Sequence, residues 1–183
     1  MNIARLGIAL LAALALLAVG CGSDDAVDGA GYTYDIPGGW EGASEDEIDE
    51  LAPIADTITI GEERDGFATN INVIAVGAVP PDTDLAAEVD RGIRALQQQP
   101  GLFGLPAGST VEVTGEPTET TLAGEDAIEL EFTTDTGSQA LLQRQVSAVG
   151  PDGDAFTITA TSIGDTADRD AAMDEALGSW AWD

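Results

Sequence analysis

Apolar and polar residues alternate along most of the chain between residues 110 and 163. Ile128, Leu130 and Phe132 illustrate the pattern, because acidic side chains occupy the two positions between them. A period of two indicates β-strands with one apolar face, and short turns containing glycine separate the runs. We therefore predict four consecutive antiparallel strands, over residues 110–119, 126–134, 139–149 and 155–163.

Shorter patterns outside this region add strands and helices to the predicted sheet. Alternation predicts strands over residues 32–36, 57–60 and 67–77, and residues 41–50 are expected to form one short helix. Apolar residues spaced by three and four predict two longer helices. The first is expected to begin at Asp82 or Thr83 and to bury Leu85, Val89, Ile93 and Leu96; the second is expected to begin at Asp165 or Thr166 and to bury Met173, Leu177 and Trp180.

These elements define the predicted fold class. It is α+β, an antiparallel sheet of about six to seven strands with two principal helices. Strict alternation is typical of a sheet with one buried face and one wetter face.

The first 21 residues have the layout of a bacterial lipoprotein signal. Arg5 precedes an apolar stretch, residues 6–20, that is shorter than the about 20 residues a membrane-spanning helix needs. Ala18-Val19-Gly20-Cys21 resembles a lipobox, so we expect cleavage before Cys21 and attachment of lipid, palmitate included, to that cysteine. An uncleaved anchor is the alternative. The expected parts are a signal peptide (1–20), a lipidated cysteine with a flexible acidic linker (21–31) and one domain (32–183).

Acidic residues dominate the charge of the chain. There are 34 Asp and Glu residues against six Arg, with no Lys and no His. Loss of Arg5 with the signal peptide would leave a side-chain charge of −29, because the full chain carries −28. Such a surface repels phosphates, which argues against nucleic-acid binding. The acidic clusters either bind cations loosely or are simply solvated. We expect the protein to be a monomer.

The residues needed for common catalytic sites are missing from the sequence. Without His, and with Cys21 as the one cysteine, Ser-His-Asp and Cys-His sites are impossible. No phosphate-binding loop or zinc ligand set is present. We therefore expect a protein that is not an enzyme and has no cofactor or metal, although a hydrolase that uses carboxylates alone remains open.

Four side chains are candidate interaction residues. Arg144 shares a predicted face with apolar residues, where an isolated charge is costly unless Glu129 or Glu131 reaches it around a register shift. Arg144 therefore forms a structural ion pair, occupies an edge position or serves as a binding-site cation. Trp40, Trp180 and Trp182 either close the core or line an apolar groove for an acyl chain.

Several short motifs resemble those of the PsbP-like fold, whose bacterial members include the LpqN and LpqT lipoproteins of actinobacteria. The matching residues are Tyr34-Asp35-Ile36-Pro37-Gly38-Gly39-Trp40, Phe67-Ala68-Thr69-Asn70-Ile71-Asn72-Val73, Leu122-Ala123-Gly124, Phe156-Thr157-Ile158-Thr159-Ala160-Thr161 and Ser179-Trp180-Ala181-Trp182. The resemblance spans nearly the whole expected domain. It implies a non-enzymatic accessory protein of the cell envelope, since LpqN-type members handle envelope lipids through contacts with transporters and secreted enzymes.

The sequence thus predicts a function at the membrane surface. We expect an extracytoplasmic lipoprotein, anchored to the cell membrane by lipid on Cys21, that serves envelope biogenesis or transport. Its expected partners are membrane-proximal envelope proteins or envelope lipids. The alternative is a carrier that binds a lipid or another hydrophobic ligand in a pocket beneath the loop of residues 101–108.

Overall fold

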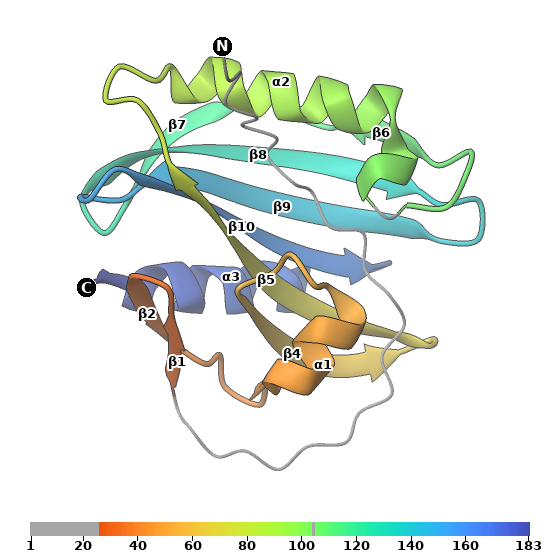
Figure 1. Ribbon diagram of the computed structural model, residues 1–183. Helices are drawn as coiled ribbons and strands as arrows, with labels where there is room; N and C mark the ends of the chain where they lie inside the picture. The colour runs from red at the N-terminus through yellow and green to blue at the C-terminus, as the bar shows by residue number, and fades with distance from the viewer. Residues whose placement is uncertain (1–25, 104) are drawn as a thin grey trace.

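The computed structural model describes residues 26–103 and 105–183. A large antiparallel sheet separates helix α2 (Leu85–Gln98) from helix α3 (Ala167–Ser179) (Figure 1). The predicted signal peptide and Cys21 lie outside the described residues. Among the residues described, no helix is long and apolar enough to cross a membrane.

The large sheet has eight strands. In spatial order they are β3 (Glu41–Gly42), β4 (Thr57–Arg64), β5 (Phe67–Ala78), β10 (Asp154–Ile163), β9 (Ala140–Val149), β8 (Glu125–Asp135) and β6 (Thr110–Val113), while β7 (Thr118–Leu122) also pairs with β8. The predicted strand over residues 110–119 is therefore two strands. Gly115 and Pro117 lie in the break, and both residue types disfavour a continuous strand.

Two hairpin turns follow directly from the local sequence. Asp65 and Gly66 join β4 to β5, and Ala123 and Gly124 join β7 to β8; all four residues have positive φ. Two consecutive positive φ values are the mark of a type I′ turn, whose twist matches that of the paired strands. The β7–β8 turn agrees with the glycine-containing turns expected between the alternating runs.

A smaller sheet lies beside one face of the large sheet. It contains β1 (Ala26–Gly29), β2 (Tyr32–Asp35) and β11 (Ala181–Trp182), with β2 in the middle. Residues 26–29 pair with β2 as a hairpin, so this part of the chain differs from the flexible linker that we predicted over residues 21–31.

The main core lies between the large sheet, the small sheet and α3 (Ala167–Ser179). It contains Ile71 and Val73 of β5, Ile158 of β10, and Met173 and Trp180 at α3. The expected burial of Met173 and Trp180 is confirmed, and Leu177 packs against the same cluster. The backbone N–H of Ala167 donates to Asp165 at 2.9 Å, which supports a helix start close to the predicted position.

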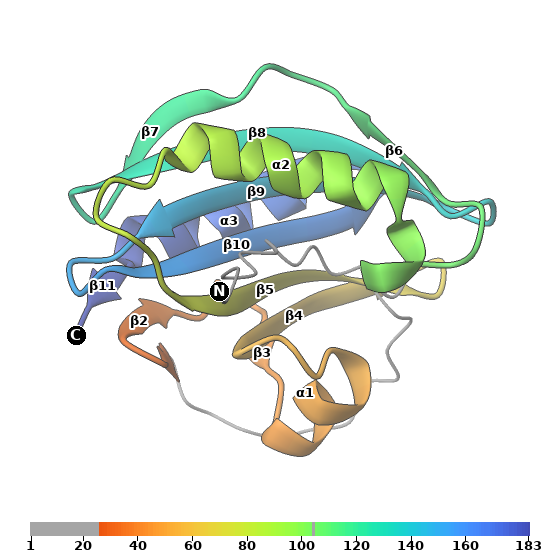
Figure 2. The ribbon, with the colours of Figure 1, turned by 45° about the horizontal axis from the view of Figure 1, so that its top comes forward.

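A second core covers the opposite face of the large sheet. Helix α2 (Leu85–Gln98) buries Val89, Ile93 and Leu96 against Leu130 and Phe132 of β8 (Figure 2). Asp84 caps this helix by accepting a hydrogen bond from the Ala87 N–H at 3.0 Å, one or two residues after the predicted start. Both faces of the sheet are thus partly buried, so the prediction of one buried face for the whole sheet was wrong. Strand β8 itself has one apolar face, under α2, and one wetter face that carries Glu129 and Glu131.

The remaining helical segments are short. Helix α1 (Glu45–Leu51) confirms the short helix expected within residues 41–50, and the 3₁₀ turn η1 (Pro100–Phe103) follows α2. The described chain is mostly antiparallel sheet with three α-helices, so the α+β class holds in outline while the strand count exceeds the prediction. Both cores are formed by described residues from Val27 onward.

Candidate functional site: an acidic cleft at one end of the sheet

A large cleft lies where four segments that are distant in the sequence meet at one end of the large sheet. These are the end of β5, the start of α2, the β7–β8 hairpin and the β9–β10 turn, on the left of Figure 1. The cleft has a volume of about 770 Å³. We call it the end cleft; its lining includes the apolar residues Val79, Pro80, Leu85, Ile128 and Val149 and the acidic residues Asp84, Glu119, Glu125, Asp126 and Asp152.

Backbone hydrogen bonds hold the walls of the end cleft in place. The N–H of Val79 donates to the carbonyl of Gly153 at 2.9 Å, which ties the end of β5 to the β9–β10 turn. The N–H of Thr83 donates to the carbonyl of Pro80 at 3.0 Å and turns the chain toward α2. Pro80 and Pro81 have no N–H group, so they cannot continue the hydrogen bonding of β5. Their backbone can only accept hydrogen bonds, through the carbonyl groups.

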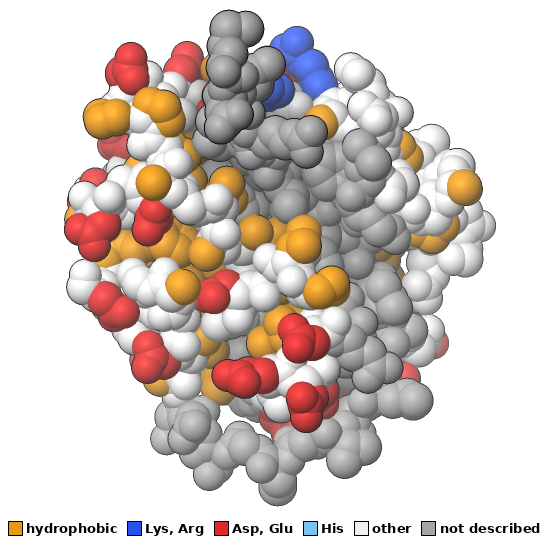
Figure 3. Space-filling view, viewed as in Figure 1, with side chains coloured by type: hydrophobic (Ala, Val, Ile, Leu, Met, Phe, Trp, Pro, Cys, Tyr) orange, Lys and Arg blue, Asp and Glu red, His pale blue; other side chains and the backbone are white. Residues whose placement is uncertain are grey.

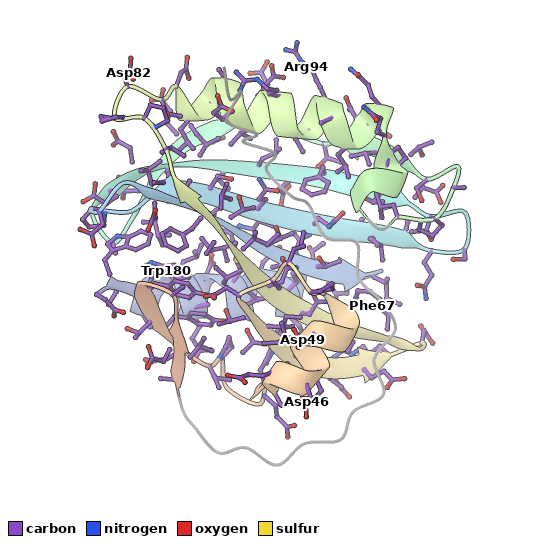
Figure 4. All side chains as sticks on the ribbon, in the orientation of Figure 1. Asp46, Asp49, Phe67, Asp82, Arg94 and Trp180 are labelled. Carbon is purple, nitrogen blue, oxygen red and sulfur yellow. The ribbon has the colours of Figure 1, made fainter. Side chains whose placement is uncertain are left out.

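The chemistry of the end cleft favours a basic ligand that also has apolar groups. Acidic and aliphatic side chains line it together, and none of the described lining residues is basic. Hydrophobic and acidic side chains lie close together on the left of the molecule in Figure 3, whereas the visible basic side chains lie at the top. Figure 4 places Asp82 on the loop before α2 and Arg94 far along that helix. The potential near the cleft is therefore negative.

A second, smaller pocket contains the predicted residue Trp40. Its volume is about 320 Å³, and it lies between the Pro37–Trp40 turn, β4 and α3. Arg64 forms ion pairs across it with Glu62 at 3.0 Å and with Asp168 at 2.7 Å. The ring of Trp40 rests on Gly61, where an added Cβ would lie 2.7 Å from the ring atom Cε2. Any larger residue in place of Gly61 would therefore displace the ring of Trp40.

The structure places the predicted residue Arg144 in an ion-pair network between β8, β9 and α3. Its Nε donates to Glu129 at 2.8 Å and its Nη1 to Asp174 at 2.7 Å. Burial lowers the pKa of Arg144, but the hydrogen bonds and charges of the two carboxylates outweigh it and raise the pKa above its ordinary value. The expected pair with Glu129 exists, whereas the expected register shift was wrong, because β8 and β9 pair regularly there.

Arg169 is a second buried arginine, and sequence reasoning missed it. Its side chain is 3% exposed and pairs with Asp170 at 2.6 Å and with Glu131 at 3.3 Å. Glu131 lies directly opposite Arg144 in the β8–β9 register. Two ion pairs thus join α3 to the sheet: Arg169 of α3 pairs with Glu131 of β8, and Arg144 of β9 pairs with Asp174 of α3. The burial of Arg169 was not predictable from the sequence, because a charged residue in the first turn of an acidic helix is usually expected to be exposed to solvent.

The three tryptophans do not form one groove. Trp180 is buried and stacks on Tyr32 at 4.4 Å and on Tyr34 at 5.6 Å between ring centroids. Trp182 packs against Phe156 at 5.3 Å, and its indole N–H donates to the carbonyl of Leu122 at 3.3 Å. Trp180 and Trp182 therefore belong to the core at the end of α3, while Trp40 lines the smaller pocket.

Hydrogen bonds from the small sheet complete the aromatic stack. Tyr32 donates to Asp56 at 2.8 Å and lies 2.8 Å from the hydroxyl of Thr57, and the hydroxyls of Tyr34 and Thr59 lie 2.9 Å apart. Burial raises the pKa of both tyrosines above the ordinary value. The two phenols are therefore neutral structural groups, and they tie β2 to β4.

Neither a metal centre nor a calcium loop is formed by the described residues. No group of three or more Asp, Glu, His or Cys side chains in this part of the chain is arranged to hold a metal ion. The sequence Asp152-Gly153-Asp154 forms the β9–β10 turn, in which Gly150 donates its N–H to the carbonyl of Asp154 at 2.8 Å.

Solved structures with a similar fold provide the comparison. No protein-family model and no curated protein sequence matches the chain. CyanoP, the PsbP of the cyanobacterium Synechocystis sp. PCC 6803, is similar with a TM-score of 0.59 and 19% identity, over 100% of this chain and 98% of that chain. The chain has the PsbP-like fold. LpqN of Mycobacterium tuberculosis, a protein involved in cell envelope biogenesis, gives 0.57 and 16% identity over 84% of each chain.

The PsbP-like fold is shared by proteins with different roles. The Ran-binding protein Mog1p of Saccharomyces cerevisiae is also similar, with a TM-score of 0.52 and 12% identity over 83% of this chain and 90% of that chain. Identities this low establish the fold alone, and one fold hosts many functions. The function of this PsbP-like chain therefore has to be argued from its own surface.

Proposed function

We propose that this protein is an extracytoplasmic lipoprotein that acts as a non-enzymatic interaction module in cell-envelope biogenesis or transport. Lipid on Cys21 holds it at the membrane surface, and the end cleft binds a segment of a membrane-proximal partner. The observation that carries the proposal is the end cleft, which has a volume of about 770 Å³ and is lined by both aliphatic and acidic residues.

Two further observations support this proposal. LpqN, which has the same fold, is involved in cell envelope biogenesis. The net side-chain charge of −28 favours encounter with basic surfaces and disfavours nucleic acid. The partner segment is therefore expected to contain Arg or Lys beside apolar residues, so that its cations meet the carboxylates of the cleft and its apolar side chains contact the aliphatic lining residues.

A carrier of a hydrophobic ligand is the second candidate function. Carrier pockets enclose most of their ligand in a mainly apolar cavity of about 300–1,000 Å³. The end cleft is large enough, but its carboxylates would be desolvated by a buried acyl chain. The apolar cavity between Val76, Val149 and Phe156 measures about 10 Å³, and neither larger pocket lies beneath the loop of residues 101–108. These features favour the interaction module.

The proposed anchor predicts where a variant without Cys21 is found. Replacing Cys21 by Ala removes the thiol that would carry the lipid, so we expect the protein to leave the membrane fraction of cells. The melting temperature should be unchanged, because both cores begin at Val27. Fractionation and circular dichroism of the two forms test this. A processed Cys21→Ala chain that stays with the membrane contradicts the anchor.

The proposed role of the end cleft predicts a charge-dependent contact. A photo-crosslinking amino acid at Thr120, which lines the cleft, should form an adduct with a membrane-proximal protein in cells. Replacing Glu119 by Gln and Asp126 by Asn should reduce the adduct at least several-fold, because two cleft carboxylates lose their charge. The control variant, Glu112→Gln with Glu116→Gln, removes the same amount of charge at exposed positions outside the cleft lining and should keep the adduct.

The outcomes of this experiment are distinct. Loss of the adduct in the cleft variant, with retention in the control variant, supports the end cleft as the contact site. Equal adducts in both variants contradict it, and so does an adduct that forms equally well from a position in the β8–β9 turn.

A further inference from the structure

Strand β7 lies at one margin of the large sheet, beside the end cleft. In the described chain it pairs with β8 alone, in a regular antiparallel register. Figure 2 shows β7 and β6 one after the other along this margin. Thr118, Glu119 and Thr121 are exposed, so the outer edge of β7 is open to solvent.

The turn that follows β7 determines which of its backbone groups face outward. Leu122 and Glu125 flank this two-residue turn and form a hydrogen-bonded pair. Hydrogen-bonded and non-hydrogen-bonded pairs alternate along an antiparallel ladder. Glu119 and Thr121 therefore belong to non-hydrogen-bonded pairs, and their N–H and C=O groups point away from β8.

The neighbouring strand at this margin has a partner for its outward backbone. The carbonyl of Val111 in β6 accepts a hydrogen bond from the side chain of Gln97 in α2 at 3.2 Å. No hydrogen bond within the described chain reaches the outward backbone groups of Glu119 and Thr121. Because an unpaired strand edge is a template for pairing with another chain, an extended segment can join the large sheet at β7.

Acidic side chains beside the open edge determine what kind of segment fits there. Glu119 pairs with Ile128, which packs under α2, so Glu119 lies on the α2 face of the sheet. Asp126 pairs with Thr121 and lies on the same face. Both carboxylates line the end cleft. A second copy of this acidic chain would add like charges, which destabilise neighbouring strands, whereas opposite charges stabilise them.

Building on the proposed function of the end cleft, we infer that the partner segment binds β7 as an added antiparallel β-strand with Arg or Lys at alternate positions. The basic residues lie directly opposite Glu119 and Thr121 and form hydrogen-bonded pairs with them. Their N–H groups therefore bond to β7, while those of the residues between them point away. Main-chain bonds provide affinity, and the alternating side chains provide specificity.

A synthetic peptide with alternating charges tests strand addition directly. The probe is fluorescent Lys-Val-Lys-Val-Lys-Val-Lys, titrated into the full-length protein purified from cells in a neutral detergent. Fluorescence anisotropy should show saturable binding. Methylating the backbone nitrogens of the two inner lysines should weaken binding about tenfold or more, because two hydrogen bonds are lost at unchanged charge. Methylating two valine nitrogens should leave binding nearly unchanged, since those N–H groups point away from β7.

A variant of the protein tests the same contact from the side of β7. Thr121→Pro removes an outward N–H, which is the position where an edge strand tolerates proline, and it keeps every carboxylate of the end cleft. It should weaken binding of the peptide several-fold. Thr121→Val keeps the N–H and should bind as the parent protein does. If Thr121→Pro lowers the melting temperature, the methylated peptides decide the question on the parent protein.

Strand addition and the proposed function fail in different ways. Loss of binding on lysine methylation alone supports the added strand. Absence of peptide binding, equal binding of both methylated peptides, or weakening by valine methylation to the same or a greater extent overturns it. A folded Thr121→Pro variant that binds as well as the parent also overturns it. The proposed function is tested separately, by the adduct that forms from Thr120 in cells.

Discussion

Replacing Trp180 by Ala is expected to destabilise the protein by about 3–5 kcal/mol, the usual cost of removing a buried tryptophan. Trp180 is 5% exposed and stacks on Tyr32 and Tyr34 with interplanar angles of 8° and 4°. It therefore joins the end of α3 to the small sheet. Domains of this size have about 5–15 kcal/mol of stability in total, so this single substitution should remove a large part of it.

Thermal unfolding of the chain from residue 22 measures this effect. Each kcal/mol corresponds to roughly 2–4 °C in melting temperature for a chain of this length. Trp180→Phe keeps an aromatic ring in the stack and should recover much of the loss. Trp40→Ala is the matched control, because Trp40 is only partly buried at the edge of the same core. A Trp180→Ala variant as stable as Trp40→Ala would show that the stack does not hold α3 in place.

Replacing Arg169 by Ala is expected to cost about 2 kcal/mol, less than the 3–5 kcal/mol typical of a buried ion pair that loses one partner. The reduction follows from its partners, because the side chains of Asp170 and Glu131 are 37% and 52% exposed and remain solvated. Arg144→Ala should cost somewhat less, since the Arg144 side chain is 14% exposed. Arg64→Ala should cost about 0–1 kcal/mol, as for other exposed ion pairs.

Denaturant unfolding of the three variants tests this order. Arg169→Met is an informative companion, because it removes the charge while keeping most of the aliphatic packing. If Arg169→Met is as stable as the parent, packing carries the effect; if it is as unstable as Arg169→Ala, the ion pairs carry it. Equal stability of all three Arg→Ala variants contradicts the account of α3 held by two buried arginines.

Local periodicity made much of the fold predictable. Strands β8, β9 and β10 begin and end, and helices α2 and α3 begin, within a few residues of their predicted positions, because each has its own repeating apolar pattern. Strand β1 was missed, since Ala26–Gly29 is short, acidic and rich in small residues. It becomes a strand by pairing with Tyr32–Asp35, which is information that the four residues do not carry themselves.

The side of the sheet that each apolar residue faces was not predictable from alternation. Ile128 and Ile158 belong to similar patterns, yet Ile128 packs under α2 and Ile158 packs under α3. The difference comes from register, because Ile128 pairs with the polar Ser147 and Ile158 pairs with the apolar Val146. A shift of one residue reverses the face of every side chain in a strand, and a single sequence does not specify that shift.

The same limit applies to the candidate sites. The pairing of Arg144 with Glu129 was predictable, because an isolated charge on an apolar strand face requires a partner. The end cleft was not, because its lining comes from four segments that only the folded topology brings together.

The most direct test of the proposed function is the identity of the partner segment that crosslinks to Thr120 in the end cleft. Mass spectrometry of the crosslinked peptide should give a segment from a membrane-proximal envelope protein that contains Arg or Lys beside apolar residues. The same segment should be absent when Cys21 is replaced by Ala, because the protein no longer stays at the membrane. An acidic or purely polar segment, or the same segment captured without Cys21, would contradict the account.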